Sequence, residues 1–496
     1  LGELVKRGDF LGIVKSDDLP FFLQLMLQDP LDTSVEMSCL YQNFGIYHEL
    51  YPDPALLFEG LSVLDNPVDI TSKIAFRKKH LGKSLSLSYK QPLEILRGEG
   101  VFLIDHTGRR YMDLVNNVAH VGHEHPKVVK AGQAQMAMLN TNSRYLHDNI
   151  LELSENLLST FPVELSVVHF VNSGSEANEL AIRMAKAYTG EKDFISMELG
   201  YHGNSNACID ISSYKFDGKG GKGAPEHTHV VPLPDTLRGI YCGANAGEKY
   251  ASHVRELVQQ LRDKGRKPAA FIAESIISCA GQIELPDNFL KEAYEVVRDA
   301  GGLCIADEVQ VGCGRVGTHF WGFELHGVVP DIVTIGKPLG HGHPLAAVVC
   351  TQEVAEAFAN GMEYFNTFGG NPVSCAIGNA VLQVIKEEKL QENALHTGNF
   401  LKEELKKMAA KHPVIADVRG QGLFLGFELL DRERNPLAKQ ANALVQRMKE
   451  RGYLMSTEGP DDNVLKIKPP MSFNQEHANQ FLKDLDLVLT ADFFQL

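Results

Sequence analysis

Short apolar runs alternate with amphipathic stretches along most of this chain of 496 residues. Runs rich in branched side chains predict buried strands. Five such runs carry the argument below, at residues 167–171, 194–197, 269–273, 303–306 and 331–335. After the first run, one buried helix face is predicted by the spacing of Ala177, Leu180, Ala181, Met184 and Ala185. Strands that alternate with helices from Ile74 onward predict an α/β fold with a mainly parallel sheet.

The sequence pattern changes along the chain and predicts four segments. Residues 1–75 are broken by glycines in the manner of β-hairpins, which predicts a β-rich N-terminal segment. We expect residues 76–130 to begin a small domain, 131–380 to form the large domain, and 381–496 to complete the small domain. Because the chain begins at Leu1 without a methionine, we expect it to be part of a longer polypeptide.

Composition narrows the class of protein. The 48 basic and 63 acidic residues give a formal net charge of −15, which argues against nucleic acid or an anionic membrane as partner. We find no signal peptide and no apolar stretch of about 18 residues, so we expect a cytoplasmic protein with no membrane partner. Eight cysteines without a CxxC pair predict reduced thiols and no metal site.

Charged side chains follow three of the predicted strands. Glu274, Asp307 and Lys337 each stand at or just beyond the end of an apolar run. In a doubly wound sheet these ends meet at the edge where ligands bind. A lysine and a carboxylate at neighbouring strand ends are what pyridoxal phosphate requires, because the amine bonds to the cofactor and the carboxylate keeps the ring nitrogen protonated. A lysine in this position, taken alone, would more often be an ordinary surface residue. The charged residues at the neighbouring strand ends favour a cofactor-binding lysine instead.

A turn after the strand at 167–171 predicts an anion site. The segment Asn172–Asn178 (NSGSEAN) leads into a helix, whose free N–H groups and dipole favour a bound anion. The alternative is a capped helix start without a ligand. In the next loop Tyr201 could stack on a flat heterocycle, or it could be a surface tyrosine. Pro338 is expected to keep Lys337 extended.

In this order, the features resemble class III aminotransferases of pyridoxal phosphate fold type I. The resemblance covers roughly residues 75–496. The matching stretches are NSGSEAN at 172–178, YHG at 201–203, DEVQVGCGR at 307–315, GKP at 336–338 and TFGGNP at 367–372. The resemblance implies a large domain with a mainly parallel seven-stranded sheet flanked by helices, a smaller α+β domain, and pyridoxal 5′-phosphate as cofactor.

The resemblance also implies a role for individual residues. Asp307 pairs with the ring nitrogen, and Lys337 bonds to the cofactor. Thr367 reaches the phosphate in the partner subunit, which implies a homodimer with shared active sites. The other implied cofactor contacts are Ser173, Gly174 and Ser175 at the phosphate, Tyr201 and Val309 on the two ring faces, Gln310 near the phenolic oxygen, and His202 and Glu274 around the ring.

Within this class, further blocks resemble phospho-lyases for ethanolamine phosphate and 5-phosphohydroxylysine. These blocks are NNVAHVGH at 116–123, NTNSRYLHDN at 140–149, GMEYFN at 361–366 and LKIKPPM at 465–471. They imply elimination of phosphate and ammonia from a small phosphorylated amine. One departure from the pattern is His341, where asparagine is expected.

Four residues are candidates for binding the substrate: Asn117, Arg144, Arg419 and Lys468. Arg144 ranks first for the substrate phosphate because it lies within a phospho-lyase-like block. Its alternative is an ion pair with Asp148, four residues on along a helix. Arg419 resembles the carboxylate-binding arginine of transaminases, and we expect it to face a carboxylate or a structural carbonyl.

Two other functions stay open. An ω-aminotransferase would use the same cofactor site with a keto-acid acceptor. A non-catalytic module is the second, although the intact Lys337 and Asp307 argue against it. Residues 2–60 resemble the C-terminal part of a lysostaphin-like metallopeptidase, but Leu19–Gln24 lacks the zinc-binding histidines and no metal is assigned. A β-rich linker is the alternative interpretation of that segment.

Overall fold

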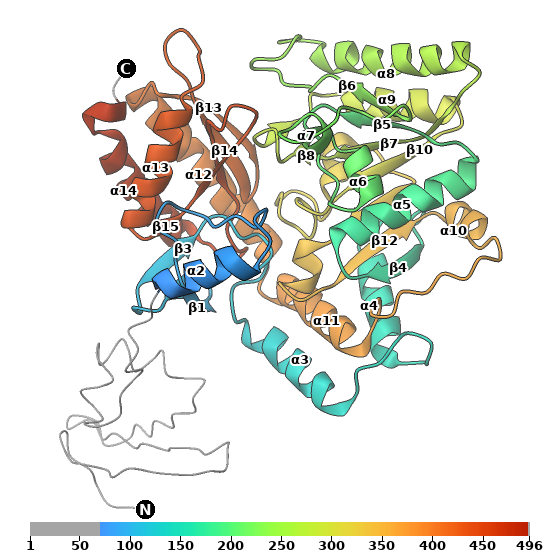
Figure 1. Ribbon diagram of the computed structural model, residues 1–496, viewed down its shortest axis with the longest axis horizontal. Helices are drawn as coiled ribbons and strands as arrows, with labels where there is room; N and C mark the ends of the chain where they lie inside the picture. The colour runs from blue at the N-terminus through green and yellow to red at the C-terminus, as the bar shows by residue number, and fades with distance from the viewer. Residues whose placement is uncertain (1–69, 495–496) are drawn as a thin grey trace, which may run out of the picture. The chain divides into compact units, whose positions relative to one another are not determined.

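The computed structural model describes residues 70–494, which fall into two units (Figure 1). The first unit comprises residues 70–97 and 104–110, and the second comprises 98–103 and 111–494. The metallopeptidase-like segment 2–60 lies outside the described residues. The four predicted segment boundaries stay predictions.

The first unit contains the helix α2 (Ile70–His80), whose last turn holds four basic residues. Positive charge at a helix C-terminus is favoured by the helix dipole. The strands β1 (Ile95–Glu99) and β2 (Phe102–Asp105) contain residues of both units.

The second unit is built around a seven-stranded sheet in the order β4-β12-β11-β10-β7-β5-β6. Its strands are β4 (Val167–Val171), β5 (Asp193–Met197), β6 (Thr228–Val231), β7 (Pro268–Glu274), β10 (Leu303–Asp307), β11 (Ile332–Ile335) and β12 (Ala346–Cys350). Only β12 runs antiparallel to its neighbours. The predicted mainly parallel seven-stranded sheet is therefore confirmed.

Helices cover both faces of this sheet, as Figure 1 shows for α5 (Gly174–Thr189) and for the pair α8 (Ala246–Asp263) and α9 (Phe289–Asp299). Alternate residues of β7 serve the two cores: Phe271 packs with α8 and α9, whereas Ile272 packs with α5. All five apolar residues predicted for one face of α5 are buried. Burying one large aliphatic or aromatic side chain contributes about 1.5–3 kcal/mol, so these two cores fix the sheet in place.

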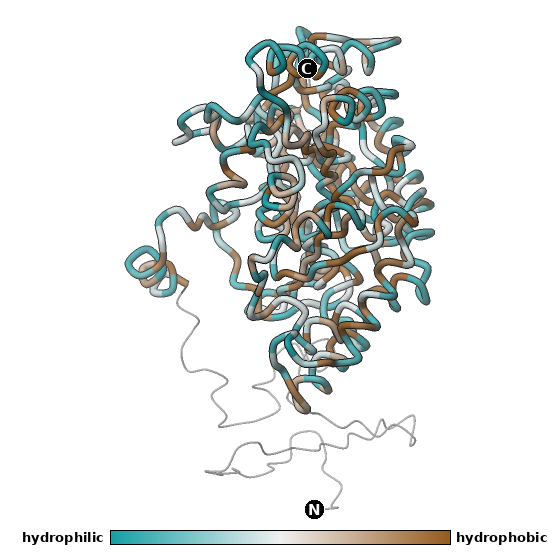
Figure 2. Tube along the Cα trace, turned by 90° about the vertical axis from the view of Figure 1, so that its right-hand side faces the viewer, coloured by the Kyte–Doolittle hydropathy of each residue, from teal (hydrophilic) through white to brown (hydrophobic). Residues whose placement is uncertain are grey.

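The remaining helices and short elements surround this sheet. They are α3 (Pro126–Met138), α4 (Asp148–Leu158), α6 (Asn206–Asp210), α7 (Ser213–Phe216), β8 (Ile276–Ile277), β9 (Ile283–Glu284), η3 (Gly322–His326), η4 (Lys337–Gly340), α10 (Gln352–Phe358) and α11 (Pro372–Glu387). In Figure 2, hydrophobic and hydrophilic segments alternate along the backbone trace.

An antiparallel sheet in the order β13-β14-β17-β16 forms the C-terminal part. Its strands are β13 (Ile415–Gln421), β14 (Phe424–Leu429), β16 (Ser456–Glu458) and β17 (Val464–Ile467), and β3 (Arg110–Asp113) pairs in parallel with β15 (Tyr453–Leu454). The helices are α12 (Leu390–Lys411), α13 (Ala438–Glu450), α14 (Gln475–Leu489) and η5 (Asp492–Phe494). No helix between residues 70 and 494 is long and apolar enough to cross a bilayer.

Candidate active site

The register of three strands brings the predicted chemistry to one edge of the large sheet. Asp307 at the end of β10 is aligned with Glu274 at the end of β7 and with Thr334 in β11. Lys337 follows β11 after one intervening residue. Neighbouring strands lie about 4.8 Å apart, so these groups meet at the carboxyl edge of the sheet, where ligands bind in such folds.

Asp307 is a buried carboxylate with three donors. Oδ2 accepts hydrogen bonds from His202 Nδ1 at 2.9 Å and from Asn178 Nδ2 at 2.8 Å. Oδ1 accepts from the backbone N–H of Val309 at 3.1 Å. Charge-assisted bonds of this kind hold a carboxylate in one orientation. Oδ1 keeps room for one further donor, which is the arrangement that a protonated ring nitrogen needs.

Glu274 supports the loop that carries Tyr201. Its carboxylate accepts hydrogen bonds from the backbone N–H groups of Tyr201 at 3.2 Å and Ser278 at 3.1 Å. Burial and the neighbouring charge of Asp307 raise the pKa of Glu274 to about 7. Glu274 therefore holds the backbone of Tyr201 in place. Its contact with the cofactor stays a prediction.

The Lys337 amine is partly buried and makes no hydrogen bond or ion pair with any other residue in the range 70–494. Burial lowers its pKa from the usual value, while the charges of Asp307 and Glu274 oppose that shift. A lowered pKa leaves more of the amine neutral and nucleophilic at a given pH.

The backbone of Lys337 differs from our expectation. We predicted an extended lysine ahead of Pro338, but Lys337 begins the 3-10 turn η4, in which the N–H of Leu339 bonds to the carbonyl of Gly336 at 2.9 Å. A proline fits the first turn of a helix because no intrahelical acceptor awaits its missing N–H. The good fit of Pro338 to the first turn of η4 outweighs the steric preference against a helical residue before proline.

Glycine brings the lysine turn against the N-terminus of α5. A Cβ atom on Gly336 would lie 3.3 Å from the backbone N of Gly174 and 3.1 Å from Val309 Cγ1. Ser173 caps α5 by accepting a hydrogen bond from the N–H of Glu176 at 3.2 Å. The N–H groups in the first turn of a helix have no intrahelical acceptor, so this turn suits the predicted phosphate.

The aromatic loop lies beside the same turn. Ser175 Oγ accepts a hydrogen bond from the N–H of Asn204 at 3.0 Å, which ties the loop to α5. The ring of Tyr201 meets that of Tyr214 edge-on at 5.8 Å. Lys215 Nζ lies 5.4 Å from the Tyr201 ring centroid, within cation–π range.

Asn117, Gln310 and Lys468 form one cluster. Gln310 Oε1 accepts a hydrogen bond from Asn117 Nδ2 at 2.7 Å and lies 3.5 Å from Lys468 Nζ. Lys468 is buried, and no carboxylate in the described part of the chain lies within ion-pair distance of it. Burial, followed by the charge of Lys466, lowers the pKa of Lys468 to about 7, and Lys337 contributes in the same direction.

Lys466 differs from Lys468 in having a partner. It projects from the same face of β17, two residues away, and forms an ion pair with Glu458 of β16. Sequence reasoning missed Glu458 because nothing in its local sequence marks it. It also missed Asn178 and Thr334, although Asn178 stands one turn beyond Gly174 on α5 and could have been found from that spacing.

Arg419 is neutralised by its surroundings. Its guanidinium donates to Glu428 at 2.6 Å, to Asp417 at 2.9 Å and to the carbonyl of Gly281 at 2.8 Å. Arg419 also lines a cavity of about 760 Å³ whose other charged groups are mostly acidic, including Glu284. Both carboxylates pair with Nη1 and balance the charge of this arginine, so it would attract a substrate carboxylate less than an unpaired arginine would.

The two remaining candidates lie at the surface. Arg144 is half exposed, donates to Glu363 at 2.7 Å and stacks on Phe365 at 4.0 Å. Its ion-pair partner is therefore Glu363 and not Asp148, which begins α4. Thr367 is exposed in the same loop as Glu363. The structure thus does not bring Arg144 and Thr367 into the cluster of Asp307, Lys337 and Lys468 by any contact between described residues.

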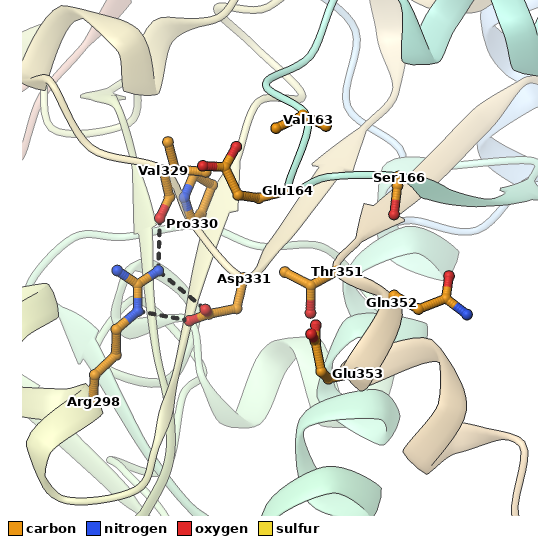
Figure 3. Close-up of a pocket in the computed structure, with 10 residues that line it drawn as sticks. All are labelled: Val163, Glu164, Ser166, Arg298, Val329, Pro330, Asp331, Thr351, Gln352 and Glu353. Atoms are coloured by element: carbon orange, nitrogen blue, oxygen red, sulfur yellow. Dashed lines mark hydrogen bonds and ion pairs between the residues drawn. The ribbon is translucent and has the colours of Figure 1, made fainter.

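A separate cavity of about 500 Å³ opens at the opposite edge of the large sheet. Figure 3 shows the residues that line it. Among them, Arg298 forms an ion pair with Asp331 at 3.0 Å and donates to the carbonyl of Val329 at 2.6 Å. Asp331 lies just before β11, far along the strand from Lys337. The lining includes none of the predicted site residues.

Comparison with known proteins assigns the family. Residues 86–489 match the family described as aminotransferase class-III. The chain is 50% identical over 431 residues to "Alanine--glyoxylate aminotransferase 2-like" of Drosophila melanogaster, covering 85% of this chain and 87% of the relative. It is 39% identical over 442 residues to "Ethanolamine-phosphate phospho-lyase homolog 1" of Caenorhabditis elegans, covering 85% and 94%.

Solved structures agree with this assignment. A phospholyase from Arthrobacter in complex with phosphoethanolamine is similar with a TM-score of 0.81 and 38% identity, covering 84% of this chain and 99% of that one. An omega transaminase from Pseudomonas jessenii in complex with PMP is similar with a TM-score of 0.76 and 26% identity, covering 83% and 97%. The chain belongs to the class III aminotransferase family and is an enzyme that uses pyridoxal 5′-phosphate.

The residues at the carboxyl edge fit this cofactor. Asp307 offers an oriented acceptor, Lys337 an unpaired amine, and the first turn of α5 an anion site. When bound, the cofactor supplies an electron-withdrawing ring that stabilises negative charge on the amine-bearing carbon of a substrate. Which residues make each contact stays a prediction.

We expect Lys337→Ala to remove the covalent cofactor bond and turnover together, because no other lysine between residues 70 and 494 follows a strand directly beside Asp307. Borohydride reduction followed by peptide mass spectrometry measures the bond. The matched control is Lys389→Ala, at an exposed lysine that directly precedes α12. Recovery of reduced cofactor on a lysine other than Lys337 would show that the assignment is wrong.

Proposed function

We propose that this enzyme is a phospho-lyase that eliminates phosphate and ammonia from ethanolamine phosphate or 5-phosphohydroxylysine to give an aldehyde. The observation that carries the proposal is Lys468, a buried cation without a carboxylate partner in the described chain, in one cluster with Gln310. Burying an uncompensated charge is costly, and an anionic substrate group beside it would offset that cost.

The state of Arg419 supports the same proposal. A transaminase must hold the carboxylate of a keto-acid acceptor, and an arginine is the usual choice because its planar fork matches a carboxylate. Here Glu428 and Asp417 both pair with Nη1 of Arg419 and neutralise its charge. Lys468, as a compact point charge, suits a phosphate group.

The relatives support a phosphorylated amine as substrate. One relative is named as an ethanolamine-phosphate phospho-lyase homolog, and one similar solved structure holds phosphoethanolamine. The alternative is an ω-aminotransferase that acts on a terminal amine. What favours it is the 50% identical relative named alanine–glyoxylate aminotransferase 2-like.

The proposed chemistry assigns one task to each residue. The Lys337 amine, once free of the cofactor, takes a proton from the amine-bearing carbon of the substrate as general base. Asp307 holds the proton on the ring nitrogen. Phosphate then leaves the neighbouring carbon with the electron pair of its C–O bond, and the charge of Lys468 stabilises it. Water converts the remaining product to an aldehyde and ammonia, so no amino acceptor is consumed.

We also propose a homodimer with shared active sites. Support comes from exposed apolar side chains in the loop that holds Thr367: Met362 is 72% exposed and Phe368 68%. Apolar groups gathered in this way are typical of a surface that another protein covers. Thr367 would reach the cofactor phosphate of the partner, and Arg144 in the same surface would act as a second contact for the substrate.

We expect phosphate release from ethanolamine phosphate or 5-phosphohydroxylysine at the same rate with and without pyruvate, because elimination needs no acceptor. A colorimetric phosphate assay measures this on both substrates. A matched substrate without the phosphate, such as ethanolamine, is the control. Phosphate release that depends on pyruvate, or alanine formation without phosphate release, would assign the enzyme to the transaminases.

We expect Lys468→Met to lower kcat/KM by a factor that corresponds to a loss of about 2–4 kcal/mol in transition-state stabilisation, because a charged partner of the phosphate is lost. Arg144→Ala tests the second candidate in the same assay. A contact of Arg144 with the substrate would lower kcat/KM with unchanged cofactor absorbance, whereas a structural role would lower the melting temperature alone. Full activity of Lys468→Met would remove Lys468 from the site.

The pH dependence of kcat/KM gives an independent test of Lys468. A lysine with a pKa of about 7 in the free enzyme is charged below that pH and loses its charge above it. We therefore expect kcat/KM for the phosphorylated substrate to fall as the pH rises through 7. Lys468→Arg stays charged and should move this fall to higher pH. An unchanged profile for Lys468→Arg would contradict the assignment.

Sedimentation of the purified enzyme at micromolar concentration should give a dimer, because Thr367 and its apolar neighbours complete a site on another subunit. Replacing Phe368 with aspartate should weaken the dimer and activity together. Replacing the exposed Tyr188 of α5 is the control. A fully active monomer would contradict shared active sites.

A further inference from the structure

A buried asparagine forms hydrogen bonds with residues of three other segments of the cofactor site. Asn178, on α5, is 1% exposed, and its side-chain amide makes three hydrogen bonds. Nδ2 donates to Asp307 Oδ2 at 2.8 Å and to the carbonyl of His202 at 2.8 Å. Oδ1 accepts from the hydroxyl of Thr334 at 2.7 Å. Every group in this network is buried, so none of these bonds competes with water.

The contacts allow only one orientation of the amide. With Nδ2 turned toward Thr334, the Asn178 oxygen would face both the carboxylate of Asp307 and the carbonyl of His202. Three acceptors would then meet without a hydrogen between them, which is costly in a buried site. The hydroxyl of Thr334 fixes the amide from the opposite side, since it has Asn178 Oδ1 as its acceptor. Thr334 therefore acts on Asp307 through Asn178.

The network also links Asp307 to β11, the strand that leads to Lys337. Thr334 lies on β11, three residues before Lys337, and is in register with Asp307. Asn178 and His202 both donate to Asp307 Oδ2, so the plane of the carboxylate is set by two side chains from different elements. Oδ1 is thereby left with the N–H of Val309 and one free lone pair.

We propose that Asn178 and Thr334 are positioning residues that aim the free lone pair of Asp307 at the ring nitrogen of pyridoxal phosphate. They touch neither substrate nor cofactor and act through Asp307. The inference goes beyond the proposed phospho-lyase reaction, since it concerns the cofactor alone and applies equally to a transaminase.

The test measures cofactor affinity in the absence of substrate. The variants are Asn178→Ala, Thr334→Val and the double variant, each stripped of cofactor and titrated with pyridoxal phosphate. We expect Asn178→Ala to weaken binding roughly ten- to a hundredfold, as for loss of a hydrogen bond to a charged group. Thr334→Val, which acts indirectly, should weaken binding about two- to tenfold. The double variant should match Asn178→Ala, because Thr334 acts through Asn178.

A spectroscopic readout separates positioning from a merely structural role. In Asn178→Ala, the pH at which the absorbance of the bound cofactor changes should rise, because a less positive ring lets the Lys337 nitrogen keep its proton more firmly. Thr334→Ser keeps the hydroxyl and should restore both affinity and titration to those of the unaltered enzyme. Thr189→Val is the control, at the far end of α5, where the hydroxyl donates to the carbonyl of Ala185 and accepts from the N–H of Glu191.

Several outcomes would overturn the proposal. Binding of the cofactor to Asn178→Ala within twofold of the unaltered enzyme is one. Independent, multiplying effects of the two substitutions are another. A third is a lower melting temperature of the cofactor-free protein with no shift in the absorbance titration. If Asn178→Ala does not fold, Thr334→Val against Thr334→Ser decides, and equal affinity of those two overturns it. None of these outcomes bears on phosphate release, so they leave the proposed function intact.

Discussion

The whole site depends on the alignment of β7, β10 and β11. Because the register sets Glu274, Asp307 and Thr334 side by side, one row of three polar groups crosses the carboxyl edge of the sheet. Each group in the row then orders a different part of the site: the Tyr201 loop, the expected ring nitrogen contact, and α5 through Asn178. A slip of any one of these strands by one residue would turn its polar side chain toward the opposite face.

The sheet and its edge chemistry could be predicted from the sequence because their signals are local. Short apolar runs mark β7, β10 and β11, and the first charged residue after each run marks the edge. The spacing of apolar residues in α5 identified its buried face without help from any contact. The extended backbone expected for Lys337 was wrong because Pro338 can also open a helical turn, and a dipeptide preference does not choose between these outcomes.

What could not be predicted depends on contacts between distant segments. Whether an arginine or lysine is available to a substrate is decided by carboxylates that approach from elsewhere: Glu428 neutralises Arg419, and Glu458 neutralises Lys466. Lys468 has no such partner in the described chain, yet its neighbourhood in the sequence is almost the same as that of Lys466. The spacing from Gly174 could have marked Asn178 itself, but not its role, since its partners come from three different segments of the chain.

Lys468 directly follows β17 of the antiparallel sheet, whereas Asp307 ends β10 and Lys337 follows β11 at the edge of the parallel sheet. Asp307 and Lys337, which are expected to act on the cofactor, thus come from a different part of the fold than Lys468, which is expected to select the substrate. Gln310 contacts Lys468 between these parts. A family built in this way can exchange one preferred anion for another by altering a single hairpin, while selection on the catalytic framework stays unchanged. Divergence between lyases and transaminases would then require few substitutions, which agrees with relatives of both names matching over most of this chain.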